Sequence, residues 1–306
     1  MRLKKVAMVG VAMQAHRSGG TANLIRRTIG WIWKECVWIV LRIRARGKKE
    51  IEKTVWGNVM YLSLDDVGVS KTLAVFGKHE PISTELFRQE IKEGMCVVDI
   101  GANIGYYALQ EARLVGETGR VIAIEPVPDN FARLKRNVER NGYRNVQLHH
   151  AAIGDENGTA KIYISRESNW SSLIPRGMHT KSADVQLWTL DTLLKDEPRV
   201  DYVRMDVEGY EVQLIKGMRG ILKRCGPGIF MEAHPWAIGS EPFIGLLKDL
   251  EDAEYRIKCV VDKAYEYPIV KRRDVIETLS LRELQVDPRV AKGEGLFMLF
   301  AVPKSK

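Results

Sequence analysis

Cysteine is scarce in this 306-residue sequence. A disulfide framework and a structural zinc site both need cysteines paired at short, recurring spacings. The chain has four cysteines, and no two of them form a C-x-x-C pair: Cys36, Cys96, Cys225 and Cys259. The sequence therefore predicts neither feature, and it favours a reducing, cytoplasmic compartment.

A long apolar run is also lacking. A membrane-spanning helix needs about 20 mostly apolar residues. The most apolar stretch, Leu24–Leu41, is interrupted by two arginines near its start and by Lys34-Glu35 in its middle. Residues 1–15 combine a basic start with an apolar run that is too short to predict a secretory signal. No internal repeat or low-complexity tract is evident. We therefore expect neither a spanning helix nor export.

Positive charge is concentrated at one end of the chain. Residues 1–49 carry twelve Lys or Arg and one Glu, a net charge of +11. Residues 50–306 carry 35 basic and 38 acidic side chains, which leaves −3 and gives the whole chain its charge of +8. A nucleic-acid-binding domain carries its basic excess on the domain face. We therefore expect no nucleic-acid partner.

Residues 1–50 are predicted to form a helical N-terminal arm. Tryptophans at positions 31, 33 and 38 lie within Leu24–Leu41, and a basic cluster follows directly: Arg42, Arg44, Arg46, Lys48 and Lys49. Tryptophans beside basic residues are typical of a helix at an anionic lipid interface. This pattern predicts a peripheral membrane contact through residues 24–49. The alternative is a helix docked on the body of the protein or on a second subunit, followed by a solvated basic linker.

Residues 96–107, CVVDIGANIGYY, predict a buried strand, a tight glycine loop and a helix N-terminus. Gly101 and Gly105, with Asn103 between them, allow a ligand to approach the backbone and the free N–H groups of the helix. Asp99 ends the strand, and we expect its carboxylate at the mouth of the loop. A carboxylate there suits an amine or a sulfonium better than a pyrophosphate. The dinucleotide fingerprint G-x-G-x-x-G is missing.

A second apolar strand, Val121–Ile124, ends in Glu125. An acidic residue at this point of a βαβ unit can accept hydrogen bonds from both ribose hydroxyls of a nucleoside. The strand, the glycine loop, the helix, the next strand and the acid follow one another in the right order. We therefore interpret Glu125 as a ribose acceptor rather than as a solvated loop carboxylate.

The third strand, Val146–His150, leads into the sequence AAIGD. Small residues such as Ala152 leave room for an adenine ring, and Asp155 is placed to accept a hydrogen bond from its exocyclic amine. The alternative is an ordinary exit from a strand into a turn.

Two further strands end in polar side chains that point to a reaction centre. Asp206 and Glu208 follow one of them, and Glu232 and His234 follow the next. Ligands of open α/β sheets bind outside the carboxyl ends of the strands, so all four are expected in one crevice. They suit a general base for an acceptor hydroxyl. Two alternatives stay open, which are a structural role in holding loops and the binding of a divalent cation.

Five motifs occur in order along the chain: DIGANIGYY, IEPVPDNFARLKRN, AAIGD, RMDVEGYEVQLIKG and MEAHP. Together they resemble the FkbM-type family of S-adenosylmethionine-dependent methyltransferases, over about Trp56 to Pro303. The resemblance implies the class I methyltransferase fold and S-adenosylmethionine as the cofactor. It also implies that residues 51–94 cover the cofactor pocket, that residues 95–306 form the cofactor-binding domain, and that Ala152 lies beside the adenine.

The expected elements make a doubly wound, mostly parallel α/β sheet. Tyr255–Val261 and Leu296–Val302 are expected to pair antiparallel, so that the last strand is antiparallel, with a helix over Val275–Glu283 between them. The motif reading favours methyl transfer to an oxygen of a sugar, lipid or secondary-metabolite acceptor. The sulfonium is already an activated donor, so no metal is required.

Two other classes of function remain as alternatives. An NAD(P)-dependent oxidoreductase or epimerase would need the missing G-x-G-x-x-G and a hydride-transfer pair such as Tyr–Lys, and neither is present. A non-catalytic, membrane-associated scaffold would keep the cofactor fold without the reaction. An oligomer is compatible with each of these functions.

Overall fold

The computed structural model describes residues 20–177, 179–262 and 275–305. Helix α2 (Gly20–Arg44) belongs to one compact unit, and the described residues from Lys49 onwards form another. We call the second one the sheet unit. It contains every candidate site residue that the sequence indicates.

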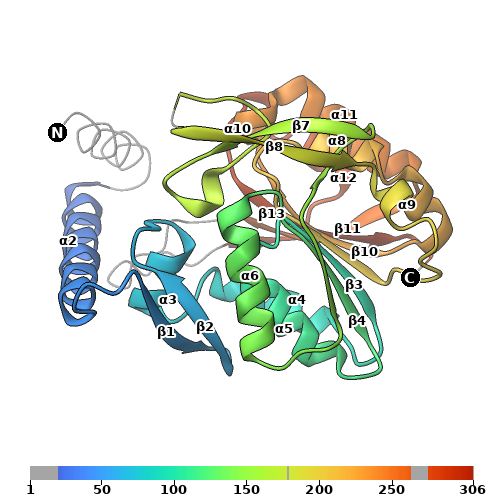
Figure 1. Ribbon diagram of the computed structural model, residues 1–306. Coiled ribbons are helices and arrows are strands. Elements are labelled where there is room, and N and C mark those ends of the chain that lie inside the picture. The colour runs from blue at the N-terminus through green and yellow to red at the C-terminus, as the bar shows by residue number, and fades with distance from the viewer. Residues whose placement is uncertain (1–19, 178, 263–274, 306) are drawn as a thin grey trace. The chain divides into compact units, whose positions relative to one another are not determined.

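Five parallel strands make one side of an eight-stranded sheet, up to its edge at β5 (Figure 1). In spatial order they are β5 (Val146–His149), β4 (Arg120–Ile124), β3 (Cys96–Ile100), β9 (Tyr202–Met205) and β10 (Gly228–Ala233). The chain leaves β3 through α5 (Tyr106–Val115) to β4, and then passes through α6 (Pro128–Arg140) to β5. It later returns to the other side of β3. The strand order therefore reverses between β3 and β9, where open α/β sheets bind their ligands.

The last strand is antiparallel, as predicted. β13 (Phe297–Pro303) lies between β10 and β11 (Tyr255–Asp262) and pairs antiparallel with both. The helix expected over Val275–Glu283 is wrong in its first part. Those residues begin as strand β12 (Val275–Glu277), which pairs with the end of β11, and helix α12 (Leu281–Gln285) starts only after a capping box at Ser280. Pairing with a neighbouring strand thus overrides the local helical pattern.

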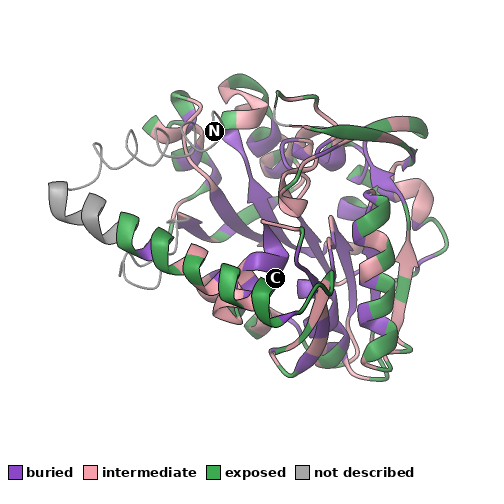
Figure 2. Cartoon of the chain, turned by 60° about the vertical axis from the view of Figure 1, so that its left-hand side comes forward, coloured by how far each residue is buried: buried purple, intermediate pink, exposed green. Residues whose placement is uncertain are grey.

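The two faces of the sheet pack against different helices, because side chains alternate along a strand. One face packs aliphatic side chains, such as Val98 and Val203, against helices of the second half of the chain: α7 (Leu190–Leu193), α8 (Glu211–Lys216), α9 (Arg219–Cys225), α11 (Ser240–Asp252), α12 and α13 (Pro288–Ala291). The other face carries an aromatic cluster of Phe87, Tyr107, Tyr202, Phe230 and Phe300. Figure 2 shows the central strands buried.

A small three-stranded sheet is inserted between β5 and β9. Strand β8 (Lys181–Trp188) pairs parallel with β6 (Ala152–Ile153) and antiparallel with β7 (Gly158–Ile164). The loop between β7 and β8 contains the short turn η1 (Ser168–Trp170). This loop reaches the cavity at the carboxyl ends of the central strands.

A hairpin and two helices precede the first central strand. Strands β1 (Glu50–Val55) and β2 (Asn58–Ser63) are joined by Trp56-Gly57, and both turn residues have positive φ, as a tight two-residue turn requires. The side chains of Asn137, on α6, and of Asn141, which caps the end of α6, accept hydrogen bonds from backbone N–H groups of β2. Helices α3 (Val69–Phe76) and α4 (Pro81–Glu90) follow.

Candidate functional site

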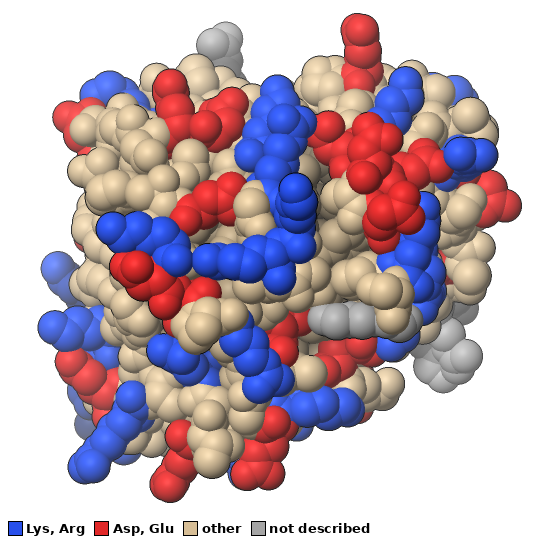
Figure 3. Space-filling model, turned by 90° about the vertical axis from the view of Figure 1, so that its right-hand side faces the viewer, with Lys and Arg blue, Asp and Glu red and all other residues tan. Residues whose placement is uncertain are grey.

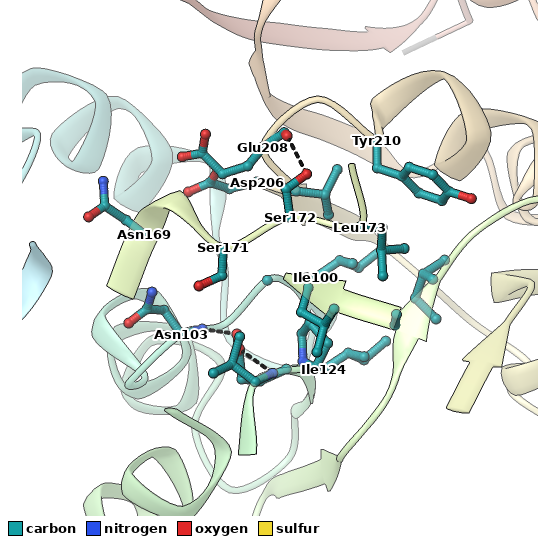
Figure 4. A pocket seen from close by; sticks show the side chains of 18 of the residues that line it. Ile100, Asn103, Ile124, Asn169, Ser171, Ser172, Leu173, Asp206, Glu208 and Tyr210 are labelled. Atoms are coloured by element: carbon teal, nitrogen blue, oxygen red, sulfur yellow. Dashed lines mark hydrogen bonds between the residues drawn. The ribbon is translucent and has the colours of Figure 1, made fainter. Parts of the chain in front are cut away.

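A cavity opens at the carboxyl ends of β3, β4 and β9, where the strand order reverses. It encloses about 570 Å³ of empty space, part of which is open to solvent. Figure 4 shows Asn103 and Ile124 on one side, and Asp206, Glu208 and Ser172 on the other. The cavity therefore joins the glycine loop, the acidic strand ends and the loop between β7 and β8.

The glycine loop turns where the sequence predicts it. Gly101 has a φ of 77° and Gly105 has a φ of 94°, so both adopt the left-handed conformation that favours glycine. A Cβ atom added at Gly101 would lie 2.0 Å from the carbonyl oxygen of Asp206. The sequence suggested that this glycine makes room for a ligand. The structure shows that close packing of β3 against the end of β9 also requires it.

Glu125 lines the cavity, but its carboxylate already accepts hydrogen bonds from the protein. One oxygen accepts from the N–H of Asn103, at 2.7 Å, and the other accepts from the N–H of Val127, at 2.8 Å. The side chain is only 3% exposed. Burial raises the pKa of Glu125 to about 7, although the two backbone N–H groups partly offset the rise. Glu125 therefore fixes the glycine loop as well as facing the cavity.

Asp99 is not at the mouth of the loop, and this expectation is wrong. The carboxylate is fully buried on the α5 side of the sheet, 3.0 Å from the guanidinium of Arg204. Burial raises the pKa of Asp99, and the charge of Arg204 lowers it in part. Arg204 also donates to the carbonyl of Gly101 and to the carboxylate of Asp206. Asp99 thus anchors the arginine that ties the glycine loop to the end of β9.

The two residues expected near an adenine are placed differently. Ala152 is buried and lines the cavity, as an adenine neighbour should. Asp155 is exposed, on the turn after β6, and is not among the residues that line the cavity. The chain turns away from the cavity between these two positions. Asp155 is therefore not placed to contact a ring bound in the cavity, and that expectation is corrected.

The four residues expected to carry out the reaction do converge, with His234 at their centre. Its Nε2 atom lies 3.6 Å from the carboxylate of Glu208 and 3.7 Å from that of Glu232. Its Nδ1 atom lies 2.7 Å from the carboxylate of Glu211, a residue that sequence reasoning missed. Of the four expected residues, Asp206 and Glu208 line the cavity. Glu232 and His234 are buried behind them.

The electrostatics of this cluster favour one protonation pattern. Burial opposes the charge of His234, but the facing carboxylates of Glu208 and Glu211 more than offset it and raise the pKa of His234 to about 10. The imidazole is therefore protonated at neutral pH and is not a free base. Burial raises the pKa of Glu208 to about 8, although the positive charge of His234 lowers it in part. Glu208 is thus the group that changes its protonation near neutrality.

A cation is the other occupant that these atoms allow. Ligand atoms of Asp206, Glu232 and His234 lie within 4.8 Å of one another. A histidine must lose its proton to bind a metal ion, whereas the surrounding carboxylates stabilise the protonated form of His234. The arrangement therefore favours an internal ion pair over a metal centre.

Two further residues hold the loop between β7 and β8 at the cavity, and the sequence did not single out either. The carboxylate of Asp66 accepts hydrogen bonds from the backbone N–H and the hydroxyl of Ser168. Arg176 donates to the backbone carbonyl of Glu208, which also accepts from the hydroxyl of Ser172 (Figure 4). The contact could not be predicted from the sequence, because Asp66 and its partner Ser168 lie 102 residues apart.

The chain is similar in sequence to known methyltransferases. A family model described as the methyltransferase FkbM domain matches residues 99–257. The hexuronic acid methyltransferase AglP of Haloferax volcanii is 30% identical over 156 residues, covering 49% of this chain and 60% of that protein. A protein-L-isoaspartate O-methyltransferase of Methanococcus maripaludis is 30% identical over 133 residues, covering 44% of this chain and 58% of that protein. The chain thus spans less than two thirds of these relatives.

Solved structures of methyltransferases also resemble the chain. The methyltransferase FkbM of Methylobacillus flagellatus KT has a TM-score of 0.42 at 14% identity, covering 75% of this chain and 54% of that chain. Fibrillarin of Aeropyrum pernix, crystallised with natively bound S-adenosyl-L-methionine, has a TM-score of 0.40 at 14% identity, covering 72% of this chain and 74% of that chain.

The residues at the cavity suit the family's methyl donor, S-adenosylmethionine. A buried carboxylate, Glu125, lines the cavity, and so do the small or apolar side chains of Ala152 and Ile153. The family model covers more than half of the chain, from the end of β3 to the start of β11. The chain belongs to the FkbM family of S-adenosylmethionine-dependent methyltransferases.

Proposed function

We propose that the protein transfers a methyl group to a hydroxyl oxygen of a sugar, lipid or secondary-metabolite acceptor. The observation that carries this proposal is the carboxylate of Glu208. It lines the cavity, it is 8% exposed, and its pKa is raised to about 8. A general base works best when its pKa lies near the working pH. Glu208 is therefore suited to accept the proton of an acceptor hydroxyl.

The glycine-loop end of the cavity binds the donor in this proposal. The residues involved are Gly101, Asn103, Gly105, Glu125 and Ala152. The carboxylate of Glu125 has lone pairs beyond those used by the backbone, and these accept the ribose hydroxyls. Asp99 acts through Arg204 as a positioning residue and does not touch the donor. When bound, S-adenosylmethionine supplies an electrophilic methyl group, and the chain's contribution is alignment and a dry site.

The other end of the cavity orients the acceptor and takes its proton. Glu208 accepts the hydroxyl proton, while the protonated His234 behind it stabilises the carboxylate between turnovers. Glu211 holds His234 through Nδ1, at 2.7 Å, and so fixes which nitrogen faces Glu208. Glu208 itself has a φ of 51°, a left-handed conformation that is rare outside glycine and is typical of functional positions. Asp206 completes the wall of the cavity.

A hydroxyl acceptor fits this site better than a carboxyl acceptor. A carboxylate is already ionised at neutral pH and needs no base. A hydroxyl must lose its proton as the new bond forms, so it gains from a base. A base at this position therefore favours hydroxyl over carboxyl methylation, although relatives of this chain include protein-L-isoaspartate O-methyltransferases.

We also propose that the acceptor is not a nucleic acid. On the face of the sheet unit seen in Figure 3, Lys and Arg side chains are interspersed with Asp and Glu. Residues 50–306 carry a net charge of −3, from 35 basic and 38 acidic side chains. A phosphate backbone is usually bound by a continuous basic surface.

The test begins with the donor and then follows the product. Calorimetric titration with S-adenosylmethionine and with NAD should show binding of the first only, because the dinucleotide fingerprint is missing. Cell extract fractions incubated with methyl-labelled donor then yield the labelled acceptor. Glu208→Gln should bind the donor normally and lose roughly 100-fold or more in rate, whereas Glu241→Gln, an exposed acid on α11, should change neither. A labelled carboxyl ester, or a fully active Glu208→Gln variant, would contradict hydroxyl methylation by this base.

A further inference from the structure

Helix α2 exposes an apolar stripe along one side. The helix has 25 residues. Ile29, Ile32, Val40 and Ile43 are spaced so that they share one side of a 3.6-residue period. Their side chains are 48%, 48%, 44% and 71% exposed. Figure 2 shows the exposed residues in green along the helix.

The opposite side of α2 is distinct from this stripe. Gly30 and Trp38 on α2, and Ala45 just after its last residue, are buried, and they follow one another at intervals of about two turns. Packing of the buried side explains why Trp38 is apolar. It does not explain the exposed aliphatic residues of the stripe. The stripe therefore adds nothing to a core formed by the buried side. A soluble helix normally carries polar residues there.

Basic residues flank the stripe and follow it. Those at the end of α2 and just beyond it are all exposed: Arg42, Arg44, Arg46, Lys48 and Lys49. Two exposed tryptophans, Trp31 and Trp33, lie near the other end of the described surface. Glu35 is the one acidic residue within α2. The helix thus combines apolar, indole and cationic groups, the three kinds that an anionic lipid interface attracts.

We propose that α2 lies flat on an anionic lipid bilayer, with the stripe of Ile29, Ile32, Val40 and Ile43 in the acyl boundary. Within the described chain, no helix has the length and apolar character that a bilayer crossing demands, so α2 rests in the interface. The positive charge of the helix favours an anionic lipid surface over a second copy of the helix as the partner of the stripe. A second copy would bring five more positive charges, whereas an anionic surface neutralises those already present.

Vesicle binding by the full-length protein tests this proposal. Co-sedimentation is measured with vesicles of phosphatidylcholine alone and of phosphatidylcholine mixed with phosphatidylglycerol. We expect strong binding to the mixed vesicles only, and release by added salt, which screens the charges. Arg42→Glu with Arg46→Glu should weaken binding by roughly 30-fold or more, because each basic residue near the surface contributes roughly fivefold. Ile32→Ser with Val40→Ser should weaken it at every salt concentration.

The matched control reverses two exposed lysines of the sheet unit, Lys223→Glu and Lys248→Glu, which change the net charge equally. It should bind vesicles like the wild type, and all variants should keep the wild-type circular dichroism spectrum and donor affinity. Equal loss in the control would show a general charge effect and overturn the assignment to α2. Unchanged binding of the Ile32→Ser, Val40→Ser variant would also overturn it. A dimer in solution that this variant dissociates, without vesicle binding by the wild type, would assign the stripe to a second copy.

Discussion

At Glu125 a single buried carboxylate connects the glycine loop to the second strand. It accepts hydrogen bonds from the backbone N–H groups of Asn103 and Val127 and from the side-chain amide of Asn130, so Glu125→Ala removes three hydrogen bonds as well as the proposed ribose acceptor. We expect weaker binding of S-adenosylmethionine and a loss of about 1–3 kcal/mol in the free energy of unfolding for each N–H left without a partner. Calorimetry and urea unfolding measure the two effects. Glu125→Gln, which keeps one oxygen acceptor, should lie between wild type and Glu125→Ala. An unchanged donor affinity in Glu125→Ala would refute the ribose assignment.

Gly101 has no room for a side chain, because the backbone carbonyl of Asp206 lies against it. The Cβ atom of Gly101→Ala would lie 2.0 Å from the carbonyl oxygen of Asp206, at a φ of 77°. We expect a loss of about 2–4 kcal/mol in the free energy of unfolding from strain and overpacking. Gly142→Ala is the matched control, because its φ is 70° but nothing lies within 4 Å of its Cβ position. It should cost only about 1–2 kcal/mol. Equal losses in the two variants would show that φ alone matters.

The pH dependence of the reaction tests Glu208 as the base. Five groups face it: Asp206, Glu211, Glu232, His234 and Arg176. A base acts when deprotonated, and burial raises the pKa of Glu208 to about 8, partly offset by the charge of His234. The rate should therefore rise with pH up to about 8 and then level off. In Glu208→Gln the residual rate should lack this rise. A rate that is already constant from pH ~5 upwards would exclude a base with a raised pKa.

At the scale of elements, the loop between β7 and β8 is held at the cavity from a distant turn. Asp66 accepts the backbone N–H and the hydroxyl of Ser168, and it also accepts backbone N–H groups of its own turn. Asp66→Ala should release the loop, which carries cavity-lining residues such as Ser172. We expect a raised KM for the acceptor and little change in donor affinity. Asp65→Ala, the exposed neighbour, is the control and should leave both unchanged. An unaltered acceptor KM in Asp66→Ala would show that the loop needs no clamp.

The elements that could be predicted from the sequence are those with local signals. The strand, glycine loop and helix of residues 96–107 appear where periodicity and positive-φ glycines indicate them. Strand β12 could not be predicted in this way, because its pairing partner in β11 lies outside any local window. The same limit applies to side chains. The partner of Asp99 is 105 residues away. Glu211 lies within the motif RMDVEGYEVQLIKG, but its partner His234 is 23 residues away, in the next motif.

At the scale of the whole molecule, the basic residues and the buried carboxyl groups lie in different parts of the chain. The basic excess lies in residues 1–49, where we propose that it meets lipid, whereas the sheet unit keeps several carboxyl groups buried near its cavity. Buried carboxyl groups are costly unless they are protonated or paired. Here they are grouped around Arg204 and His234, which supply the compensating positive charge. These buried groups thus lower the free energy of unfolding, by an amount that depends on pH.

Three buried groups at the cavity make stability depend on pH in the same direction. Burial raises the pKa of Glu125 to about 7 and that of Glu208 to about 8. Burial opposes protonation of His234, but facing carboxylates raise its pKa to about 10. Each group binds its proton more tightly in the folded state. The stability that each group contributes at low pH is therefore lost as the pH rises from its unfolded to its folded pKa. This interval is about pH 4.5 to 7 for Glu125 and about pH 4.5 to 8 for Glu208. For His234 it is about pH 6.5 to 10.

All three changes have the same sign, so the free energy of unfolding should fall between pH ~6 and ~8, by about 1.4 kcal/mol per pH unit for each excess proton held by the folded state. Urea unfolding at several pH values measures this slope. Glu208→Gln should make it shallower, because a neutral amide takes up no proton. The exposed acid Glu241 gives the matched control, since Glu241→Gln should leave the slope unchanged. A free energy of unfolding that stays constant or rises over this interval would show that the buried groups are ionised alike in the folded and unfolded states, and it would remove the basis for assigning Glu208 as a base near neutrality.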